Sequence, residues 1–359
     1  MKRFISIFMT LLMLLAVTAC TSPEATAPLA TEAPTETATA ELPNSTQIPA
    51  IPAEQPTEQP SEEPTEEPAA PSEPVRVAAL TGPTGVGLAF LTKISDAYAL
   101  DLQADPQNVV AKFSSGEVDI AAVPINLAAT LYKKTEGNVA VIAVNTLGVL
   151  YFLENGDTVQ SVSDLAGKTI YATGQASTPE YILRQILDQN GLTDSVTVEY
   201  IAEASALAAQ LAEENDVKIA FMPEPMASVA RAKSESVRVV LSANDLWKEK
   251  NEAEIVQGVY IVNKNYLASH HEQVNQFLTD AAESVSKVLT DENAAAAVVE
   301  LGIIGQEPIA KRAIPNCNIV LLTGAEMRTM VEAMLQTLFA AEPKSVGGSL
   351  PADDFYYVP

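Results

Sequence analysis

Hydrophobic residues from Val75 onward form short apolar runs that alternate with amphipathic stretches. Val75–Leu80 and residues 118–123 are apolar runs of strand length, and each leads through turn residues into a stretch with helical spacing of apolar positions. A third run, at residues 139–144, is rich in Val and has no polar interruption, which is typical of a strand buried on both faces. This alternation predicts an α/β fold with a mostly parallel sheet flanked by helices.

A second series of strands and helices begins after an extended segment at residues 147–153. Residues 168–172 predict its first strand, and the helix that follows opens with Ser177 and Glu180 at the spacing of a capping box. Further strands are predicted at residues 196–201, 218–222 and 237–241. We therefore expect two lobes, with residues 75–154 in the first and residues 155–256 in the second.

The C-terminal part, residues 257–359, is expected to return to the first lobe. Residues 256–262 predict the returning strand, and the remainder is predicted to be mostly helical. A last helix after Thr323 carries an apolar stripe made of Met327, Met330, Val331, Met334, Leu335, Leu338 and Phe339. We expect this stripe to pack on the first sheet rather than to form a ligand groove.

The N-terminus has the order of an export signal. Lys2 and Arg3 precede an apolar run at residues 4–19, which is too short to span a bilayer comfortably. The run ends in Val-Thr-Ala-Cys, and this sequence resembles a bacterial lipobox. Residues 1–19 are therefore predicted to be a lipoprotein signal peptide, and Cys20 is predicted to be lipidated.

Residues 20–74 are predicted to be a disordered tether behind the lipidated Cys20. Between Thr21 and Pro74 there are 12 Pro and 11 Glu residues but no Lys, Arg, Gly or aromatic residue. Such a composition buries too little apolar surface to offset chain entropy. The repeated prolines and the mutually repelling carboxylates favour an extended spacer, with a recognition role for the Pro-Glu repeats as the alternative.

Charge and cysteine content narrow the function classes. The 46 acidic residues outnumber the 21 basic ones, for a formal net charge of -25, which argues against nucleic acid as a partner. If Cys20 is acylated, Cys317 is the remaining thiol and no internal disulfide can form. The only histidines, His270 and His271, are adjacent and therefore point to different faces. We expect no metal site, no cofactor and no Cys-His catalysis.

The Gly-rich turn after the first strand does not match a nucleotide-binding motif. Gly82 and Gly87 have phosphate-loop spacing, but Leu88 and Ala89 follow where Lys and Ser or Thr would be needed. The sequence contains no G-x-S-x-G elbow and no H-E-x-x-H helix, so an enzyme is not supported. Open α/β sheets bind ligands beyond the carboxyl ends of their strands, and the loops there are the candidate solute contacts.

The order of these features resembles the extracytoplasmic solute-binding lipoproteins of bacterial ABC importers. The resemblance covers residues 75–359 and is greatest to the branch of nitrate, sulfonate and thiamine-precursor receptors. It rests on residues 80–85 (LTGPTG), 116–121 (GEVDIA), 164–168 (DLAGK) and 223–225 (PEP). Residues 346–351 (VGGSLP) and 355–357 (FYY) are similar to a subgroup of this branch from Gram-positive anaerobes.

The resemblance implies a two-lobed type II periplasmic-binding-protein fold, with hinge crossings near Leu153 and Gln257. It implies that a small polar or anionic solute binds between the lobes, which close on it. The matching solute-binding positions are Thr81, Pro83, Thr84, Gly85, Asn126 and Thr146 in the first lobe and Gln175, Ser177 and Glu224 in the second.

The implied partners are an ABC permease with its ATPase and, through the lipid anchor, the membrane. The protein would be a monomer on the extracytoplasmic face of the cell membrane, in a Gram-positive cell. Two alternatives stay open, namely a lipid-anchored enzyme on the same scaffold and a surface sensor. The sequence does not identify the solute.

Overall fold

The computed structural model describes residues 73–175, 177–213, 218–251 and 253–358. All of them belong to one unit, Glu67–Pro359. The predicted signal peptide, the lipidation of Cys20 and nearly all of the predicted tether lie outside the described residues.

The first sheet has six strands in the order β11-β4-β10-β3-β1-β2. β2, β1, β3 and β4 run in one direction, and β10 and β11 run in the other. The strands are β1 (Val75–Leu80), β2 (Tyr98–Gln103), β3 (Ile120–Pro124), β4 (Val139–Leu147), β10 (Val256–Asn263) and β11 (Ile319–Leu322). The predicted mostly parallel sheet is confirmed, but β11 lies in a stretch for which the sequence predicted mostly helix.

The second sheet has five strands in the order β7-β6-β8-β5-β9. Here β5 alone runs against the other four strands of the sheet. The strands are β5 (Leu150–Asn155), β6 (Thr169–Ala172), β7 (Thr197–Tyr200), β8 (Ile219–Pro223) and β9 (Val237–Ser242). We call the six-stranded sheet with its helices lobe 1 and the five-stranded sheet with its helices lobe 2.

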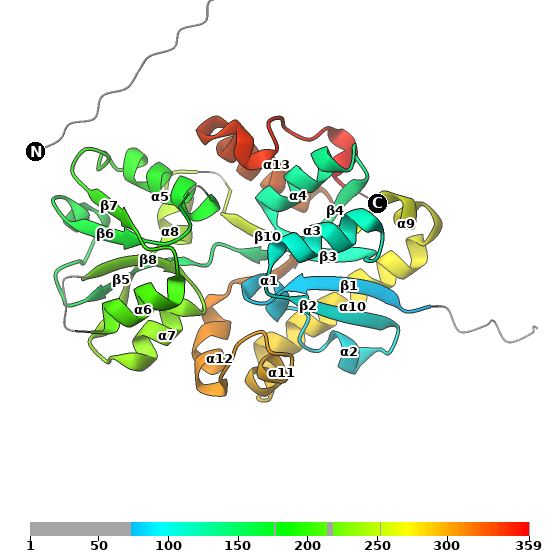
Figure 1. Ribbon diagram of the computed structural model, residues 1–359, viewed down its shortest axis with the longest axis horizontal. Coiled ribbons are helices and arrows are strands. Elements are labelled where there is room, and N and C mark those ends of the chain that lie inside the picture. The colour runs from blue at the N-terminus through cyan, green and yellow to red at the C-terminus, as the bar shows by residue number, and fades with distance from the viewer. Residues whose placement is uncertain (1–72, 176, 214–217, 252, 359) are drawn as a thin grey trace, which may run out of the picture. The chain divides into compact units, whose positions relative to one another are not determined.

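Helices cover both faces of each sheet (Figure 1). In lobe 1 they are α1 (Pro83–Val86), α2 (Leu91–Ile94), α3 (Pro106–Ser115), α4 (Ile125–Lys134), α9 (Lys264–Ser269), α10 (His271–Thr290), α11 (Ala294–Glu300), α12 (Glu307–Ala313) and α13 (Gly324–Ala341). In lobe 2 they are α5 (Thr178–Gln189), α6 (Ala204–Ala212), α7 (Met226–Lys233) and α8 (Ala243–Lys248). Short 3₁₀ turns are η1 (Val162–Leu165), η2 (Ile314–Asn316), η3 (Pro343–Val346) and η4 (Asp353–Phe355).

Two segments of the chain connect the lobes. The first is the short link between β4 and β5, and the second runs from the end of α8 at Lys248 to the start of β10 at Val256. The first connection comes before the expected position at Leu153, because Leu153 already pairs with Ala220 inside the five-stranded sheet. Lobe 1 therefore ends near Leu147 rather than at residue 154, and the chain returns to lobe 1 with β10 at Val256.

Both sheets turn the carboxyl ends of their parallel strands toward these connections. Leu147 ends β4 and leads directly into the link, and the start of β5 at Leu150 pairs with Pro223 at the end of β8. The carboxyl ends of β1 and β3 lie at the same edge of the first sheet as the carboxyl end of β4. The carboxyl end of β6 lies at the same edge of the second sheet as the carboxyl end of β8. The loops predicted to contact solute thus follow strand ends at the connected edges of the two sheets.

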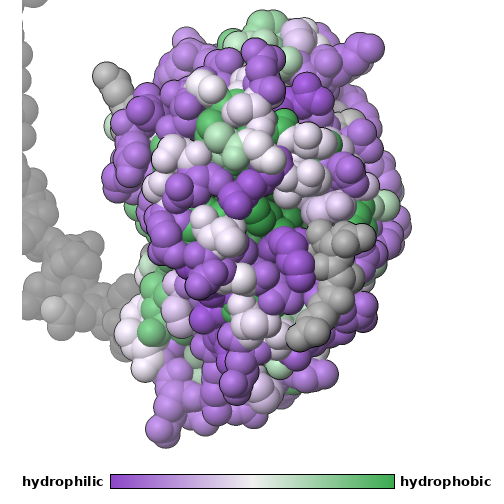
Figure 2. Space-filling model, turned by 90° about the vertical axis from the view of Figure 1, so that its left-hand side faces the viewer, coloured by the Kyte–Doolittle hydropathy of each residue, from purple (hydrophilic) through white to green (hydrophobic). Residues whose placement is uncertain are grey.

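The apolar stripe of α13 packs where it was predicted to pack. Met327, Val331 and Met334 are almost fully buried, and the helix contacts β4 and β10 of the first sheet. The predicted capping box at α5 does not form, since the Ser177 hydroxyl donates to the carbonyl of Gly174 instead. Figure 2 looks onto the lobe 2 end of the unit, where hydrophilic residues cover most of the visible surface.

Candidate functional site

The loop after β1 carries four of the predicted solute-binding residues. Thr81 is exposed just beyond the strand, and Pro83 occupies the first turn of α1. Gly82 has a φ of 121°, a backbone conformation that disfavours side chains. Thr84 and Gly85 are buried behind it, and a Cβ on Gly85 would lie 2.5 Å from the carbonyl oxygen of Leu80. The tight turn therefore requires glycine for space as well as for conformation.

A buried hydrogen-bonded group holds this loop against β4. The Asn145 amide Nδ2 donates to the carbonyl of Thr84 at 3.2 Å, and the Asn145 Oδ1 accepts from the Thr146 hydroxyl at 3.0 Å. All three residues are buried. A Cβ on Gly258 of β10 would lie 2.5 Å from Asn145 Oδ1 and 2.6 Å from Thr84 Cγ2. Gly258 is thus the residue that allows Asn145 and Thr84 to meet.

Three buried polar atoms make no hydrogen bond to any described residue. They are the hydroxyl of Thr178, the Oε1 of Gln257 and the hydroxyl of Tyr260. Thr178 and Gln257 lie at the connected edges of the sheets, at the start of α5 and of β10, respectively. Unpaired buried polar atoms are uncommon in folded proteins, and a bound solute or water satisfies them. Sequence reasoning missed all three residues, since nothing local marks a Thr or Gln as unpaired.

The predicted contacts of lobe 2 differ in their exposure. Gln175 is exposed and Ser177 is partly buried, and Gly174 adopts a φ of 76° in the same turn. The Ser177 hydroxyl donates to the Gly174 carbonyl at 2.6 Å. Backbone N–H groups in the first turn of α5 have no partner within the helix, as at every helix N-terminus. The predicted turn therefore places α5 with its N-terminus at the connected edge of the second sheet.

Glu224 is the one carboxyl among the nine predicted site residues, and it is deeply buried, with 1% of its surface exposed. Its Oε2 accepts from the Ser228 backbone N–H at 3.1 Å, and its Oε1 accepts from the Ser228 hydroxyl at 3.0 Å. Burial raises the pKa of Glu224 to about 7, although the hydrogen bonds from Ser228 and the charges of Arg231 and Arg312 act in the opposite direction. In this structure Glu224 caps the start of α7 through Ser228.

Residues around Cys317 connect the lobes next to Glu224. The Tyr151 hydroxyl of lobe 2 donates to the Asn316 carbonyl of lobe 1 at 2.7 Å, and the Asn318 amide donates to the Gly148 carbonyl. Cys317 is buried, and its pKa is raised by burial and further by the charge of Glu224. Cys317 also shares an apolar cluster with Val86 of α1. The loop after β1 and the loop after β8 therefore approach each other around Cys317.

The predicted site residues are brought together only in part. Thr84 and Thr146 meet through Asn145. Asn126 is the second residue of α4, just after β3, and its carbonyl accepts from the Thr130 hydroxyl. Glu224 lies near Cys317, and Gln175 is on the exposed turn before α5. Contact of these residues with a solute stays a prediction.

Three grooves are lined by other residues. One of about 470 Å³ lies between α7 and the α11–α12 region and begins at Pro225. Grooves of about 710 Å³ and 770 Å³ lie where α5 and α8 face α13. None of the nine predicted solute-binding residues lines any of these three grooves. The burial of Thr84, Thr146 and Glu224 shows that the connected edges are covered in this conformation.

The sequence match to a family model covers lobe 2, both connections between the lobes and part of lobe 1. The model of the NMT1/THI5 like family matches residues 99–295, which is more than half of the chain. The chain belongs to the NMT1/THI5-like family. No curated protein sequence matches it.

Solved structures establish the fold of this NMT1/THI5-like chain. An ABC transporter protein from Parabacteroides distasonis is 23% identical with a TM-score of 0.69, over 80% of this chain and 99% of that one. The ligand-binding component of an ABC-type import system from Staphylococcus aureus, solved with zinc, is 13% identical with a TM-score of 0.62, over 80% and 97%. The periplasmic aliphatic sulphonate binding protein SsuA from Escherichia coli is 16% identical with a TM-score of 0.61, over 78% and 92%. The implied two-lobed type II periplasmic-binding-protein fold is confirmed.

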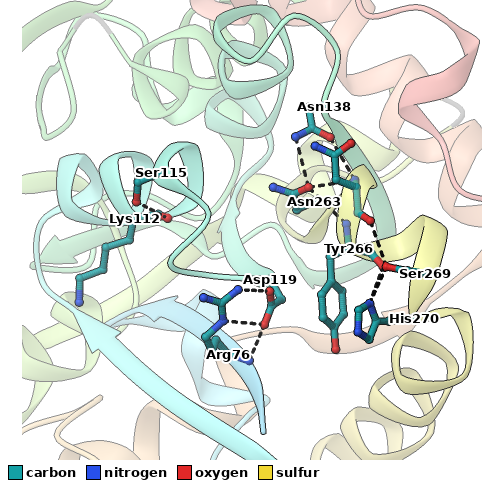
Figure 3. Close-up of polar contacts among 10 residues, drawn as sticks. Arg76, Lys112, Ser115, Asp119, Asn138, Asn263, Tyr266, Ser269 and His270 are labelled. Carbon is teal, nitrogen blue, oxygen red and sulfur yellow. Dashed lines mark hydrogen bonds and ion pairs between the residues drawn. The ribbon is translucent and has the colours of Figure 1, made fainter. Parts of the chain in front are cut away.

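At the other edge of the first sheet, where the parallel strands begin, side chains of the NMT1/THI5-like chain contact one another (Figure 3). Arg76 at the start of β1 forms a two-point ion pair with Asp119, with Nε 3.0 Å from Oδ2. Asn138 donates to Asn263, and the ring of Tyr266 stacks on His270 with centroids 4.1 Å apart. These residues lie at or just before the starts of parallel strands, or at and after the end of β10. They therefore lie at the edge formed by the amino ends of the parallel strands, away from the predicted solute loops.

Within the part of the NMT1/THI5-like chain that the structure describes, no group of three or more His, Cys, Asp or Glu side chains could hold a metal ion. Over the same residues, no helix combines the length and the apolar character needed to cross a membrane.

Proposed function

We propose that the protein is the solute-binding receptor of an ABC importer. The observation that carries the proposal is the placement of the candidate loops at the facing carboxyl edges of two sheets joined by two chain segments. Membership of the NMT1/THI5-like family and the fold shared with ABC-importer binding proteins support it. With only two connections, rotation of one lobe against the other is the motion that the topology permits most readily.

The proposed solute is a small polar or anionic molecule held between the lobes. Lobe 1 would contribute Thr81, Pro83, Thr84, Gly85, Asn126 and Thr146, and lobe 2 would contribute Gln175, Ser177 and Glu224. The starts of α4 and α5, one in each lobe, supply backbone N–H groups that suit an anionic or polar atom. The hydroxyl of Thr178, which has no hydrogen-bond partner among the described residues, would be a further donor at the start of α5.

Anchoring and delivery complete the proposal. The Val-Thr-Ala-Cys sequence supports export and acylation of Cys20, and the Pro- and Glu-rich segment behind it would be the spacer between the membrane and the lobes. A closed, solute-loaded receptor differs in shape from the empty one, and a permease with its ATPase would recognise this difference. The protein would work as a monomer on the extracytoplasmic face and would carry out no catalysis.

A thermal-shift screen followed by calorimetry tests this function. The full chain with Cys20→Ser would be screened against alkanesulfonates such as taurine and MOPS, against nitrate, and against the aminopyrimidine precursor of thiamine. The proposal expects at least one saturable, one-to-one ligand that raises the melting temperature, because a ligand that binds only the folded state stabilises it. Turnover of a bound compound would contradict the receptor assignment and favour an enzyme. Absence of binding across the whole screen would contradict the proposed solute class.

A further inference from the structure

A buried carboxyl lies at the contact between the two lobes. Glu224 follows β8 of lobe 2, and its backbone N–H donates to the Val149 carbonyl in the link between the lobes at 3.0 Å. Ser228 of α7 donates to the Glu224 carboxyl, and α7 packs against α12 of lobe 1, the helix that carries Arg312. Arg312 and Cys317 of lobe 1 both interact electrostatically with Glu224. The Tyr151 hydroxyl donates to the Asn316 carbonyl of lobe 1, and the pKa of Tyr151 is raised by burial and further by the charge of Glu224. Glu224 is therefore enclosed by groups from both lobes.

The surroundings of Glu224 are poorly suited to a negative charge. The titratable and charged groups that face it are Tyr151 on β5, Arg231 on α7, Arg312 on α12 and Cys317 after η2. Both arginines act on Glu224 from a distance, and neither forms an ion pair with it. Among the described residues, only Ser228 donates hydrogen bonds to the carboxyl group of Glu224. An ionised carboxyl that is buried without a paired cation is costly, and such a group binds a proton instead.

We infer that closing the two lobes over Glu224 couples closure to the uptake of one proton. Separation of the lobes would move the lobe 1 segment at Arg312–Cys317 away from the carboxyl and admit water to it. In this structure, where groups from both lobes enclose it, burial raises the pKa of Glu224 from 4.5 to about 7. A proton therefore binds more tightly to the closed form, and lower pH favours closure.

The size of the effect follows from this linkage. If water restores the ordinary carboxyl pKa in the open form, the ratio of closed to open molecules rises about tenfold between about pH 8 and pH 6. The inference goes beyond the proposed function because it concerns the empty protein. It rests on the proposed lobe movement but not on any solute.

The experiment measures the distance between the lobes by pulsed electron paramagnetic resonance. Spin labels would be attached to the full chain at Ser114→Cys in α3 and Asp194→Cys in lobe 2, since both positions are exposed. Cys20→Ser removes one of the two native thiols, and the second, Cys317, is buried. His270→Gln and His271→Gln would be present throughout, so that no imidazole contributes to the pH response. Glu224→Gln would be compared with Glu235→Gln, which changes an exposed carboxyl of the same lobe.

The inference expects the short-distance population of the parent and of Glu235→Gln to increase about tenfold relative to the long one from pH 8 to pH 6. Glu224→Gln should keep the same populations at both values. Equal populations at both pH values in the parent would overturn the inference. Should Glu224→Gln fail to fold, the carboxyl ¹³C shift of Glu224 in labelled parent protein decides, and titration in the ordinary carboxyl range would overturn the inference as well. Neither result bears on the receptor proposal, because that proposal is tested by solute binding.

Discussion

The side chain of Asn145 joins two predicted solute-binding residues, because it donates to the Thr84 carbonyl at 3.2 Å and accepts from the Thr146 hydroxyl at 3.0 Å. Asn145 is 1% exposed, so both bonds are shielded from water. The loop after β1 is thus held by a side chain of β4 and does not depend on a solute for its position.

Replacement of Asn145 by Leu should destabilise the protein. The change leaves the Thr84 carbonyl and the Thr146 hydroxyl without their partner, which costs about 1–3 kcal/mol of the free energy of unfolding for each buried group left unpaired. Urea denaturation of the variant and the parent measures the difference. Asn138→Leu, which removes a part-buried amide at the opposite edge of the sheet, is the comparison. An equal loss of unfolding free energy in the two variants would show that the hydrogen bonds of Asn145 stabilise the protein no more than those of Asn138.

Gly258→Ala should also destabilise the protein, and Gly305→Ala should not. A Cβ at Gly258 would lie 2.5 Å from Asn145 Oδ1, whereas a Cβ at Gly305 would meet nothing within 4 Å. Forcing an atom into a packed region typically costs about 1–3 kcal/mol. Thermal unfolding of the two variants provides the measurement. A melting temperature for Gly258→Ala equal to that of Gly305→Ala would mean that the Thr84 loop can move aside freely.

The stability of the protein should depend on pH through Glu224. Burial raises the pKa of Glu224 to about 7 in the folded state from 4.5. The folded state therefore binds the proton more tightly than the unfolded state, so this contribution is complete below about pH 4.5 and is lost as the pH rises to 7. The loss is at most about 3 kcal/mol. Denaturant unfolding between these pH values should show the fall in the parent and a smaller fall in Glu224→Gln. The same pH dependence of the unfolding free energy in the parent and in Glu224→Gln would refute the prediction.

Membrane attachment should depend on Cys20. The Val-Thr-Ala-Cys sequence predicts acylation of that thiol, so Cys20→Ala should move the protein from the membrane fraction to the soluble fraction. Detergent-phase partitioning of expressed parent and variant measures this. Cys317→Ala is the control for loss of a thiol, since Cys317 is buried. Equal partitioning of parent and Cys20→Ala into detergent would argue against a lipid anchor.

Sequence patterns predicted most of the fold because apolar periodicity and turn residues mark each strand and helix locally. They misplaced the first connection between the lobes, since the apolar character of residues 139–153 is nearly continuous across it. The missed strand β11 has only four residues and depends on pairing with β4, a contact distant in sequence.

The candidate site was predicted less completely than the fold. Strand ends identify the loops that carry Thr84, Thr146 and Ser177, because the position of a loop at a sheet edge follows from element order. The unpaired atoms of Thr178 and Gln257 depend on which partners tertiary packing supplies, and no local signal records this. The burial of Glu224 beside Cys317 likewise arises from the approach of two distant segments.

The proposed receptor holds one solute with both lobes, and calorimetric titration of two matched variants distinguishes this arrangement from a one-sided site. Thr84→Val in lobe 1 and Thr178→Val in lobe 2 each replace a hydroxyl by a methyl group of similar shape. The Thr178 hydroxyl has no partner among the described residues, so its removal should leave the melting temperature of the empty protein unchanged. With the ligand found by the thermal-shift screen, each variant should lose about 0.5–1.5 kcal/mol of binding free energy, the usual contribution of one hydrogen bond. Loss of affinity in only one of the two variants, or in neither, would contradict a site shared between the lobes.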